Sequence, residues 1–441
     1  MTGSVPDMEL INVRLPLEQD EGLFRLTVRR GIWSAVEAQQ GPAEPDGHIP
    51  IGDAGLEELS HAPALDLQGK VALPGFVDAH MHLDKAYSIE HIRNRSGTLR
   101  EAIEGYRSLA ASFSKETIKS RIVKAAHASV SYGSLTLRSH LDVPLHLGRE
   151  VAMRTVEAAL EAREEVGSFV DIQYFPMYYH DPAMEGELTA FAGETLRMGI
   201  DGVGGAPHLT PDPARNIGWA FKLAASFGRP IDLHIDESDD PAVKTIDTYC
   251  DHIIRNGYSG KATAGHLCSL SAMAQPEADR LIAKMAEAGV GAVTLPAVNL
   301  YLQGRGDSGN VRRGVTRIRE LAEAGVPLAA ASDNIQDPFH PFGRGDMLQI
   351  GLITAYAAHL AKEEDIATIL SMLTYTPASI VGLANYGIKP GSPAGFVVLD
   401  APSGESLFQE LPAARWVYNK SRWIHATQIK RQWAETVLTG R

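Results

Sequence analysis

The feature that most constrains the fold is an alternation that begins at residue 71. Short apolar or β-branched runs take turns with amphipathic stretches rich in Ala, Glu, Leu and Arg, and this pattern predicts strands alternating with helices. We count eight strand-like runs, which are VALPGFVDAH (71–80), SLTLRSHLDV (134–143), FVDIQYFP (169–176), DGVGGAP (201–207), PIDLHID (230–236), KATAGHL (261–267), VGAVTLP (290–296) and VPLAAASD (326–333).

The segments between these runs predict helices, for example VAMRTVEAALEAREEV (151–166), PARNIGWAFKLAASF (213–227) and VTRIRELAEAG (315–325). Eight parallel strands, each followed by a helix, predict an α/β fold of the (β/α)8 TIM-barrel type, whose active sites lie at the C-terminal ends of the strands. An open doubly wound sheet is the alternative. It usually has fewer strands and a glycine-rich phosphate loop, which GVGGAP (202–207) matches only weakly.

Both ends of the chain differ from this pattern. The first 70 residues and the tail contain short strand-like pieces separated by Gly, Pro and acidic turns, such as MELINVRLP (8–16) and GFVVLDAP (395–402). Neither end offers enough strands for a core of its own. We therefore expect residues 1–70 and 390–441 to form one small β-sandwich domain, and residues 71–389 to form the barrel.

Composition excludes several classes of protein. The chain of 441 residues is 44% hydrophobic and 22% charged, which is typical of a globular protein. Its formal charge of −13 argues against a nucleic-acid partner. The two cysteines, Cys250 and Cys268, form no CxxC pair. The start has no signal-peptide pattern and no segment is long and apolar enough to span a membrane, so we expect a cytoplasmic location.

Histidines and an aspartate end several of the predicted strands. His80 and His82 end the first run, His234 ends the fifth and Asp333 ends the eighth. Because residues i and i+2 of a strand point to the same side, both His80 and His82 can face the mouth of the barrel. Three imidazoles and a carboxylate suit zinc or ferrous iron and leave room for a water, whose pKa such a metal lowers.

Each of these residues also has an ordinary structural explanation. An isolated HxH pair seldom binds metal, an aspartate after a strand is often a helix cap, and His266 alone would be a hydrogen-bonded wall residue. Their joint position at the strand ends favours a site. Glu237, just beyond the fifth strand, can carry a proton there. For His140 and His208 we expect structural hydrogen bonding.

Several longer motifs resemble a known family. The chain is similar to the amidohydrolase superfamily, most closely its cytosine deaminase branch, and it also resembles the related N-isopropylammelide isopropyl amidohydrolases. The resemblance covers the whole predicted barrel and rests on PGFVDAHMHLDK (74–85), TLRSHLDV (136–143), VDIQYFP (170–176), DLHIDESDD (232–240), AGHLCSL (264–270), LPAVNLYLQGR (295–305) and SDNIQDPFHPFGRGDMLQ (332–349).

The resemblance implies roles for individual residues. One divalent metal, Zn²⁺ or Fe²⁺, would be bound by His80, His82, His234 and Asp333, and Asp333 would also take part in catalysis. Glu237 would shuttle the proton, and His266 would orient the water or polarise the substrate. Gln173 would read the edge of a pyrimidine ring. The fourth strand contains no lysine to bridge a second metal.

The implied reaction is hydrolytic deamination of a small nitrogen heterocycle that carries a ring amidine, with release of ammonia. Asn334 replaces the second aspartate of cytosine deaminases and would bind the substrate ring with an amide that both donates and accepts. Lys85 and Arg93 lie where they could meet an oxygen-rich or anionic ring substituent. The alternatives are removal of an N-alkylamino group from an ammelide-type triazine, ring opening of a cyclic amide, and a non-enzymatic metal-binding barrel. We expect a small-molecule substrate and a homo-oligomer.

Overall fold

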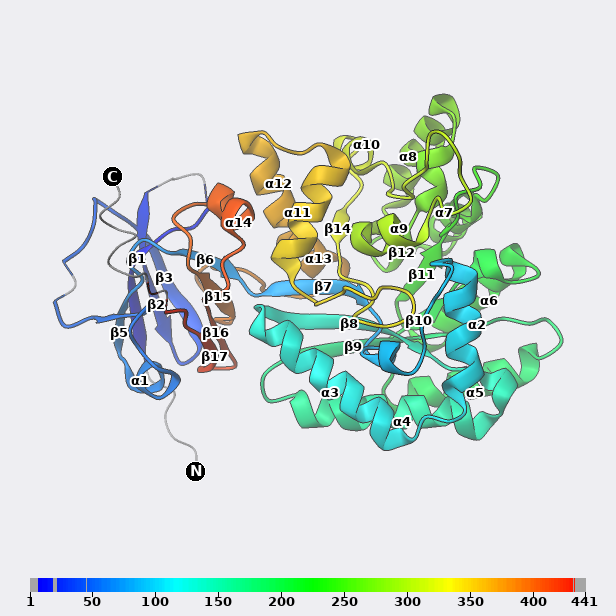
Figure 1. Ribbon diagram of the computed structural model, residues 1–441, viewed down its shortest axis with the longest axis horizontal. Helices are drawn as coiled ribbons and strands as arrows, with labels where there is room; N and C mark the ends of the chain where they lie inside the picture. The colour runs from blue at the N-terminus through cyan, green and yellow to red at the C-terminus, as the bar shows by residue number, and fades with distance from the viewer. Residues whose placement is uncertain (1–6, 19–21, 45, 431, 433–441) are drawn as a thin grey trace. The chain divides into compact units, whose positions relative to one another are not determined.

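The computed structural model describes residues 7–18, 22–44, 46–430 and 432. It divides the chain into two compact units, which Figure 1 shows with their elements labelled. One unit comprises Met1–Pro74 and Gly387–Arg441, and the other comprises Gly75–Tyr386.

The larger unit is built on a sheet of eight parallel strands, each of which pairs with its neighbours in sequence. The strands are β7 (Phe76–Met81), β8 (Ser134–Asp142), β9 (Asp171–Met177), β10 (Val203–Gly205), β11 (Ile231–Ile235), β12 (Ala262–His266), β13 (Gly291–Thr294) and β14 (Leu328–Ala330). The sheet closes just past β14, where Asp333 N donates to His80 O (2.9 Å) and His82 N donates to Asp333 O (3.2 Å). The predicted (β/α)8 barrel is confirmed.

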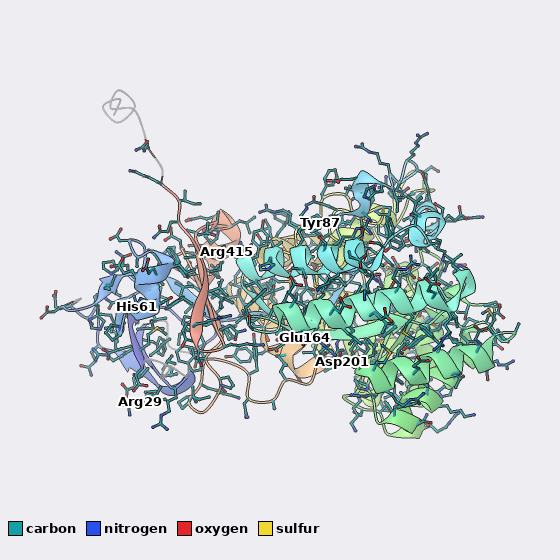
Figure 2. All side chains as sticks on the ribbon, turned by 90° about the horizontal axis from the view of Figure 1, so that it is seen from below. Arg29, His61, Tyr87, Glu164, Asp201 and Arg415 are labelled. Atoms are coloured by element: carbon teal, nitrogen blue, oxygen red, sulfur yellow. The ribbon has the colours of Figure 1, made fainter. Side chains whose placement is uncertain are left out.

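Helices follow the strands along the chain. They are α2 (Leu99–Ala110), α3 (Lys115–Ser131), α4 (Arg149–Val166), α5 (Glu185–Met198), α6 (Pro213–Phe227), α7 (Thr245–Asn256), α8 (Gln275–Ala288), α9 (Pro296–Leu302), α10 (Ile318–Glu323), α11 (Met347–Ala358), α12 (Glu363–Leu373) and α13 (Tyr375–Ile380), with short 3-10 turns η1 (Ser88–Glu90), η2 (Leu145–Leu147), η3 (Pro207–Leu209) and η4 (Cys268–Ala272). Helices α3 and α4 pack along each other, and Glu164 marks α4 in Figure 2.

Local chemistry explains where α6 begins and ends. Asp212 accepts a hydrogen bond from Arg215 N as the N-cap, and Pro213 occupies the first helical position. Gly228 ends the helix with φ +62°, a left-handed conformation that glycine adopts without a steric penalty. The predicted helix over 213–227 is confirmed for these reasons.

The smaller unit contains two sheets. One has the order β3 (Ile32–Gln39), β2 (Leu23–Arg29), β1 (Met8–Val13), β5 (Ala64–Asp66) and β4 (Ile49–Pro50); the other has the order β17 (Arg422–Thr427), β16 (Arg415–Asn419), β15 (Phe396–Leu399) and β6 (Val71–Pro74). Two short helices, α1 (Leu56–His61) and α14 (Gly404–Glu410), complete the unit. One apolar core joins both sheets, where Trp33 lies 5.1 Å from Phe396 between ring centroids.

The first predicted strand, 71–80, is wrong as a single element. It breaks at Gly75 into β6, which pairs antiparallel with β15 in the small unit, and β7, which belongs to the barrel. A Cβ on Gly75 would lie 2.2 Å from Leu135 Cδ1, so glycine permits this close passage of the backbone. No polar turn separates the two halves, and every residue of both strands is buried, so periodicity does not reveal the break.

Two further expectations concern cysteines and membranes. Both cysteines, Cys250 and Cys268, are buried and free. In the part of the chain that the structure describes, every helix is too short or too polar to cross a membrane.

Candidate functional site: a histidine and carboxylate cluster at the barrel mouth

Four of the predicted metal ligands meet at the C-terminal ends of the strands. His80 and His82 lie at the end of β7, His234 lies on β11, and Asp333 follows β14. The Nε2 atom of His234 lies 3.2 Å from that of His80 and 3.1 Å from that of His82. Asp333 Oδ1 lies 3.3 Å from His82 Nε2. All four side chains are buried.

This donor set fits a divalent metal ion. Metal–nitrogen bonds of about 2.0–2.1 Å in a tetrahedron place the ligand atoms roughly 3.3 Å apart, close to the separations between these nitrogens. Burial lowers the pKa of each of the three imidazoles well below its ordinary value, so their lone pairs are free to coordinate. Both carboxylate oxygens of Asp333 are buried and have no hydrogen-bond partner among the described residues.

His266 and Glu237 form the opposite wall of the cluster. His266 ends β12, and its Nδ1 lies 3.7 Å from Glu237 Oε1. Burial raises the pKa of Glu237 well above its ordinary value, and the Asp333 carboxylate adds to the shift. A carboxyl group with a raised pKa can accept and return a proton near neutral pH.

Asn299 controls the orientation of His266. Its Nδ2 atom donates a hydrogen bond to His266 Nδ1 over 3.1 Å, from the start of α9. With the amide nitrogen as the donor, Nδ1 is the acceptor, and we assign the ring proton to Nε2. Among the described residues Nε2 has no partner, so this N–H is available to the site.

Several residues at the cluster adopt left-handed backbone conformations. The φ angles are +62° at Asp333, +70° at His266 and +54° at Asp236. Such conformations cost about 1–3 kcal/mol each and are retained where other contacts impose them. Asp333 is held by its two backbone hydrogen bonds to β7, and the Asp236 carboxylate accepts from Thr245 N and Ile246 N.

Gly265 makes room for His80. A Cβ at this position would lie 2.8 Å from His80 Cε1 and 2.9 Å from its Nδ1. Those separations are too short for any side chain, and the buried imidazole has no open space into which it could move. Packing against His80 therefore requires glycine at position 265.

A second layer of polar residues lies beneath the cluster. Asp78 accepts hydrogen bonds from Ser332 N and Ser332 Oγ. Arg138 donates from Nη1 to Asp232 Oδ2 over 2.8 Å, and both residues are almost fully buried. Asp78, Arg138 and Asp232 each lie two residues before a histidine on the same strand. They therefore support the histidine side chains from the layer below.

The structure does not bring Gln173 to the mouth. Its Oε1 accepts from Arg138 Nε (3.0 Å) and Nη2 (2.9 Å), and its Nε2 donates to Val381 O (3.0 Å). In the register of β8 and β9, Gln173 pairs with Arg138, one layer below the histidines, and Met177 pairs with Asp142 at the mouth. The hydrogen-bonding capacity of Gln173 is thus used within the barrel, and we leave it out of the proposed substrate pocket.

His140 is closer to the cluster than the sequence indicates. Its ring centroid lies 4.1 Å from that of His80 and 4.6 Å from that of His234. Neither ring nitrogen has a hydrogen-bond partner among the described residues, so the expectation of structural hydrogen bonding is wrong for His140. His140 Nε2 lies 3.5 Å from Asp232 Oδ1, and these two with His80 form a second group of converging donor atoms. His208 does contact a backbone oxygen, 3.2 Å from Nδ1 to His234 O.

Asn334 and Lys85 belong to a buried polar network next to the cluster. Asn334 Nδ2 donates to Asp337 Oδ2 over 2.7 Å. Burial by itself lowers the pKa of Lys85, but the Asp142 and Asp84 carboxylates and the Tyr179 phenol raise it above its ordinary value overall. Lys85 is therefore already surrounded by acidic groups.

Arg93, the other cation that the sequence singles out, lies exposed on the surface. Sequence reasoning missed Arg138, Asp232, Asp78 and Asn299, and it gave His140 only a structural role. A period-2 pattern of polar residues could have found most of them, because Asp78, His80 and His82 alternate along the chain, as do Arg138 and His140, and Asp232 and His234.

A closed parallel barrel with buried histidines and carboxylates at its C-terminal mouth defines the class of barrel enzymes whose chemistry takes place at the strand ends. Comparison with known proteins narrows this class. The model of the amidohydrolase family matches residues 110–422, and the chain belongs to that family.

Individual relatives agree with this assignment. The chain is 32% identical to a pterin deaminase from Rhizobium rhizogenes over 396 residues, which cover 88% of each chain. It is 31% identical to an N-isopropylammelide isopropyl amidohydrolase from Pseudomonas sp. over 77% of this chain and 82% of the relative. The crystal structure of 5-methylcytosine deaminase from Klebsiella pneumoniae with 5-fluorocytosine has a TM-score of 0.86 and 28% identity, covering 97% of this chain and 100% of that one.

Proposed function

We propose that the protein is a hydrolytic deaminase that removes the exocyclic amino group of a small nitrogen heterocycle and releases ammonia. The observation that carries this proposal is the pairing of a four-donor cluster with a buried carboxyl group of raised pKa, Glu237, across one small site. The relatives include two proteins named as deaminases of pterin and of 5-methylcytosine, which supports a ring amidine as substrate.

We assign metal binding to His80, His82, His234 and Asp333. When bound, a divalent ion such as Zn²⁺ or Fe²⁺ acts as a Lewis acid and lowers the pKa of a water molecule. The native metal and a single ion per chain are parts of the proposal. The absence of a lysine from β10 and its flanking residues supports one ion.

Glu237 carries the proton in this proposal. It accepts a proton from the attacking water as the water oxygen bonds to the ring carbon, and passes it to the adjacent ring nitrogen. The proton of the hydroxyl group now on the ring carbon then reaches the exocyclic nitrogen through the same carboxyl group, the exocyclic C–N bond breaks, the C=O bond forms and ammonia leaves. Water and the amino heterocycle thus yield ammonia and the oxo heterocycle, with no change in oxidation state. His266, with its proton on Nε2, donates to the oxygen that bonds the ring carbon.

Cleavage of an N-alkylamino group from a triazine is the second candidate. The 31% identity to the N-isopropylammelide enzyme and the neutral Asn334 at the mouth favour it. The proton transfers by Glu237 are the same, and an alkylamine leaves in place of ammonia.

Amine release from a panel of pyrimidines, pterins and alkylamino-triazines tests both candidates. The zinc-loaded and iron-loaded enzymes are compared with Glu237→Gln, which serves as the inactive control. Ammonia from an aminated ring supports the first proposal, whereas alkylamine alone supports the second. Loss of the ring chromophore with formation of a carboxylate would identify ring opening instead and would contradict both. A cytoplasmic location and a homo-oligomer stay predictions.

A further inference from the structure

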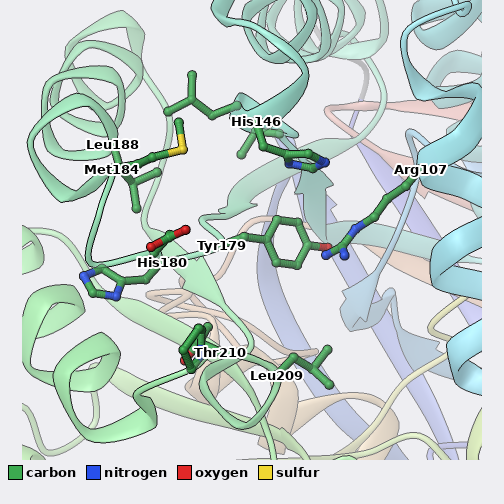
Figure 3. Close-up of a pocket in the computed structure, with 12 residues that line it drawn as sticks. Arg107, His146, Tyr179, His180, Met184, Leu188, Leu209 and Thr210 are labelled. Carbon is green, nitrogen blue, oxygen red and sulfur yellow. The ribbon is translucent and has the colours of Figure 1, made fainter.

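A cavity of about 240 Å³ opens beside the cluster, in the loops that follow β8, β9 and β10. Its polar lining consists of Arg107, His146, Tyr179 and Thr210, while Leu209 and Met184 contribute apolar surface. Figure 3 shows Arg107 reaching toward the Tyr179 ring, with His146 nearby and Met184 on the far side. We call this cavity the Arg107 pocket.

The Arg107 pocket lies next to the reactive site. Leu209 and Thr210 directly follow His208, whose Nδ1 lies 3.2 Å from the backbone oxygen of His234. On another side Tyr179 forms the wall, and its phenol interacts electrostatically with Lys85. Lys85 in turn acts on His82 and Glu237. The segment that lines the pocket thus directly follows a residue in contact with the strand that carries His234.

Arg107 is a cation that forms no ion pair with any residue that the structure describes. Its guanidinium lies 4.6 Å above the centroid of the Tyr179 ring. Nε is buried without a hydrogen-bond partner, and within the described ranges no carboxylate forms an ion pair with this side chain. Lys85, in contrast, is enclosed by acidic groups. A half-buried guanidinium that faces a cavity without an acidic partner favours an anionic ligand.

Two other titratable side chains at the pocket, His180 and Asp181, are engaged with a neighbour or exposed. His180 is engaged with Glu185, at 3.0 Å. Asp181, which also lines the pocket, is exposed and accepts a hydrogen bond from Ala183 N. The cavity is smaller than the roughly 300–1,000 Å³ of a complete ligand site, so it suits one part of a larger ligand.

We propose that the Arg107 pocket binds a carboxylate-bearing substituent of the heterocyclic substrate while the ring occupies the cluster. Arg107 pairs with the carboxylate, His146 and Thr210 offer further hydrogen bonds, and Leu209 and Met184 contact the apolar surface of the substrate beside the carboxylate. This inference rests on the proposed function and specifies its substrate class. It assigns the specificity for an anion to Arg107 in place of Lys85 and Arg93.

The test compares pairs of substrates that differ by one carboxylate, which are cytosine with cytosine-5-carboxylate and pterin with pterin-6-carboxylate. The measured quantity is the ratio of kcat/KM for the carboxylated member to kcat/KM for its parent. Arg107→Met should lower this ratio about 10- to 100-fold, mainly through KM, because a charge-assisted pair is lost. Arg107→Lys should retain part of the ratio, since it keeps the charge without the planar fork.

Arg100→Met is the matched control. Arg100 lies on the same helix, its side chain is 88% exposed, and it pairs only with Glu104 among the described residues. It should leave the ratio unchanged. An equal ratio for wild type and Arg107→Met, or an equal fall in Arg100→Met, would overturn the inference. Should Arg107→Met fail to fold, Arg107→Gln, which is shorter but keeps N–H donors without the charge, takes its place.

Calorimetric binding of the reaction products separates this inference from the proposed function. Uracil-5-carboxylate should bind the metal-loaded wild type more tightly than uracil, and Arg107→Met should abolish that difference. If no heterocycle is hydrolysed, the proposed function fails, and this binding difference still shows whether the pocket binds a carboxylate. Equal binding of both products by wild type would refute the pocket even if deamination is observed.

Discussion

At the scale of single residues, the surroundings of Glu237 have opposing effects on its pKa. Burial raises its pKa first, Asp333 raises it further, and Lys85 lowers it. The carboxyl group lies outside the four-donor set, and the proposed reaction requires it to take up and release protons. Its substitution can therefore separate proton transfer from metal binding.

Glu237→Gln should retain the metal and lose at least on the order of a hundredfold in kcat, because the amide keeps the size but cannot cycle a proton. Metal content by elemental analysis and steady-state kinetics test this on the same preparation. His234→Ala is the contrasting variant and should lose both. A near-normal rate in Glu237→Gln with metal in place would assign the proton shuttle to another group.

Asn299 is a positioning residue that acts through His266. Asn299→Ala should lower kcat about 10-fold or more with little change in KM, because the proton is then free to move from Nε2 to Nδ1. ¹⁵N-histidine NMR distinguishes the two tautomers and reports a change that a purely structural role would not produce. If the Nε2–H tautomer persists in Asn299→Ala, the assigned role of Asn299 is wrong.

At the scale of elements, buried ion pairs connect the barrel strands below the site. Arg138 on β8 joins Asp232 on β11 and Gln173 on β9, and it stacks on Phe175 at 4.5 Å from the ring centroid. Burial raises the pKa of Asp232 to about 6, and Arg138 opposes that rise. The arginine therefore keeps this carboxylate ionised inside the barrel.

Arg138→Met should destabilise the fold by about 3–5 kcal/mol, since it leaves a buried carboxylate without a partner. The double variant Arg138→Met with Asp232→Asn should recover part of that loss, because it removes the uncompensated charge as well. Urea denaturation of Arg138→Met, Asp232→Asn, the double variant and the exposed control Arg100→Met measures the effect, and the control should change by less than about 1 kcal/mol. A double variant that is as unstable as the sum of its two single changes would argue against the coupling.

At the scale of the whole molecule, the candidate ligands come from distant parts of the chain. His80 and His82, His234 and Asp333 lie at the ends of β7, β11 and β14, and Asp333 also supplies the hydrogen bonds that close the barrel. An ion held by all three strands would bind the folded barrel and not the unfolded chain. Metal binding is thus expected to stabilise the fold.

The purified protein should contain about one divalent ion per chain, and chelation should lower its Tm. At a free metal concentration of 100 times Kd, the stabilisation is about 2.7 kcal/mol. Elemental analysis and thermal unfolding before and after chelation measure both quantities, with metal-free His234→Ala as the reference. Two tightly bound ions per chain, or a Tm that does not respond to chelation, would contradict the single-site assignment.

The sequence by itself determined the barrel and brought the four candidate metal ligands to one end of it. Strand and helix periodicity are local properties, and eight alternations leave few topologies other than a closed parallel barrel. The polar residues that end those strands meet at one mouth whatever the details of packing, which is why His80, His82, His234 and Asp333 could be brought together from the sequence alone.

The tertiary structure decided what depends on register and on partners from other strands. Pairing of β9 with β8 puts Gln173 one layer below the mouth, and a steric requirement at Gly75 divides the first apolar run between two units. The close contact between the His140 and His80 rings and the Arg107 pocket likewise arise from residues far apart in the chain. These features were beyond the sequence because a side chain's hydrogen-bond partners, unlike its strand position, are set by neighbours that only the closed barrel supplies.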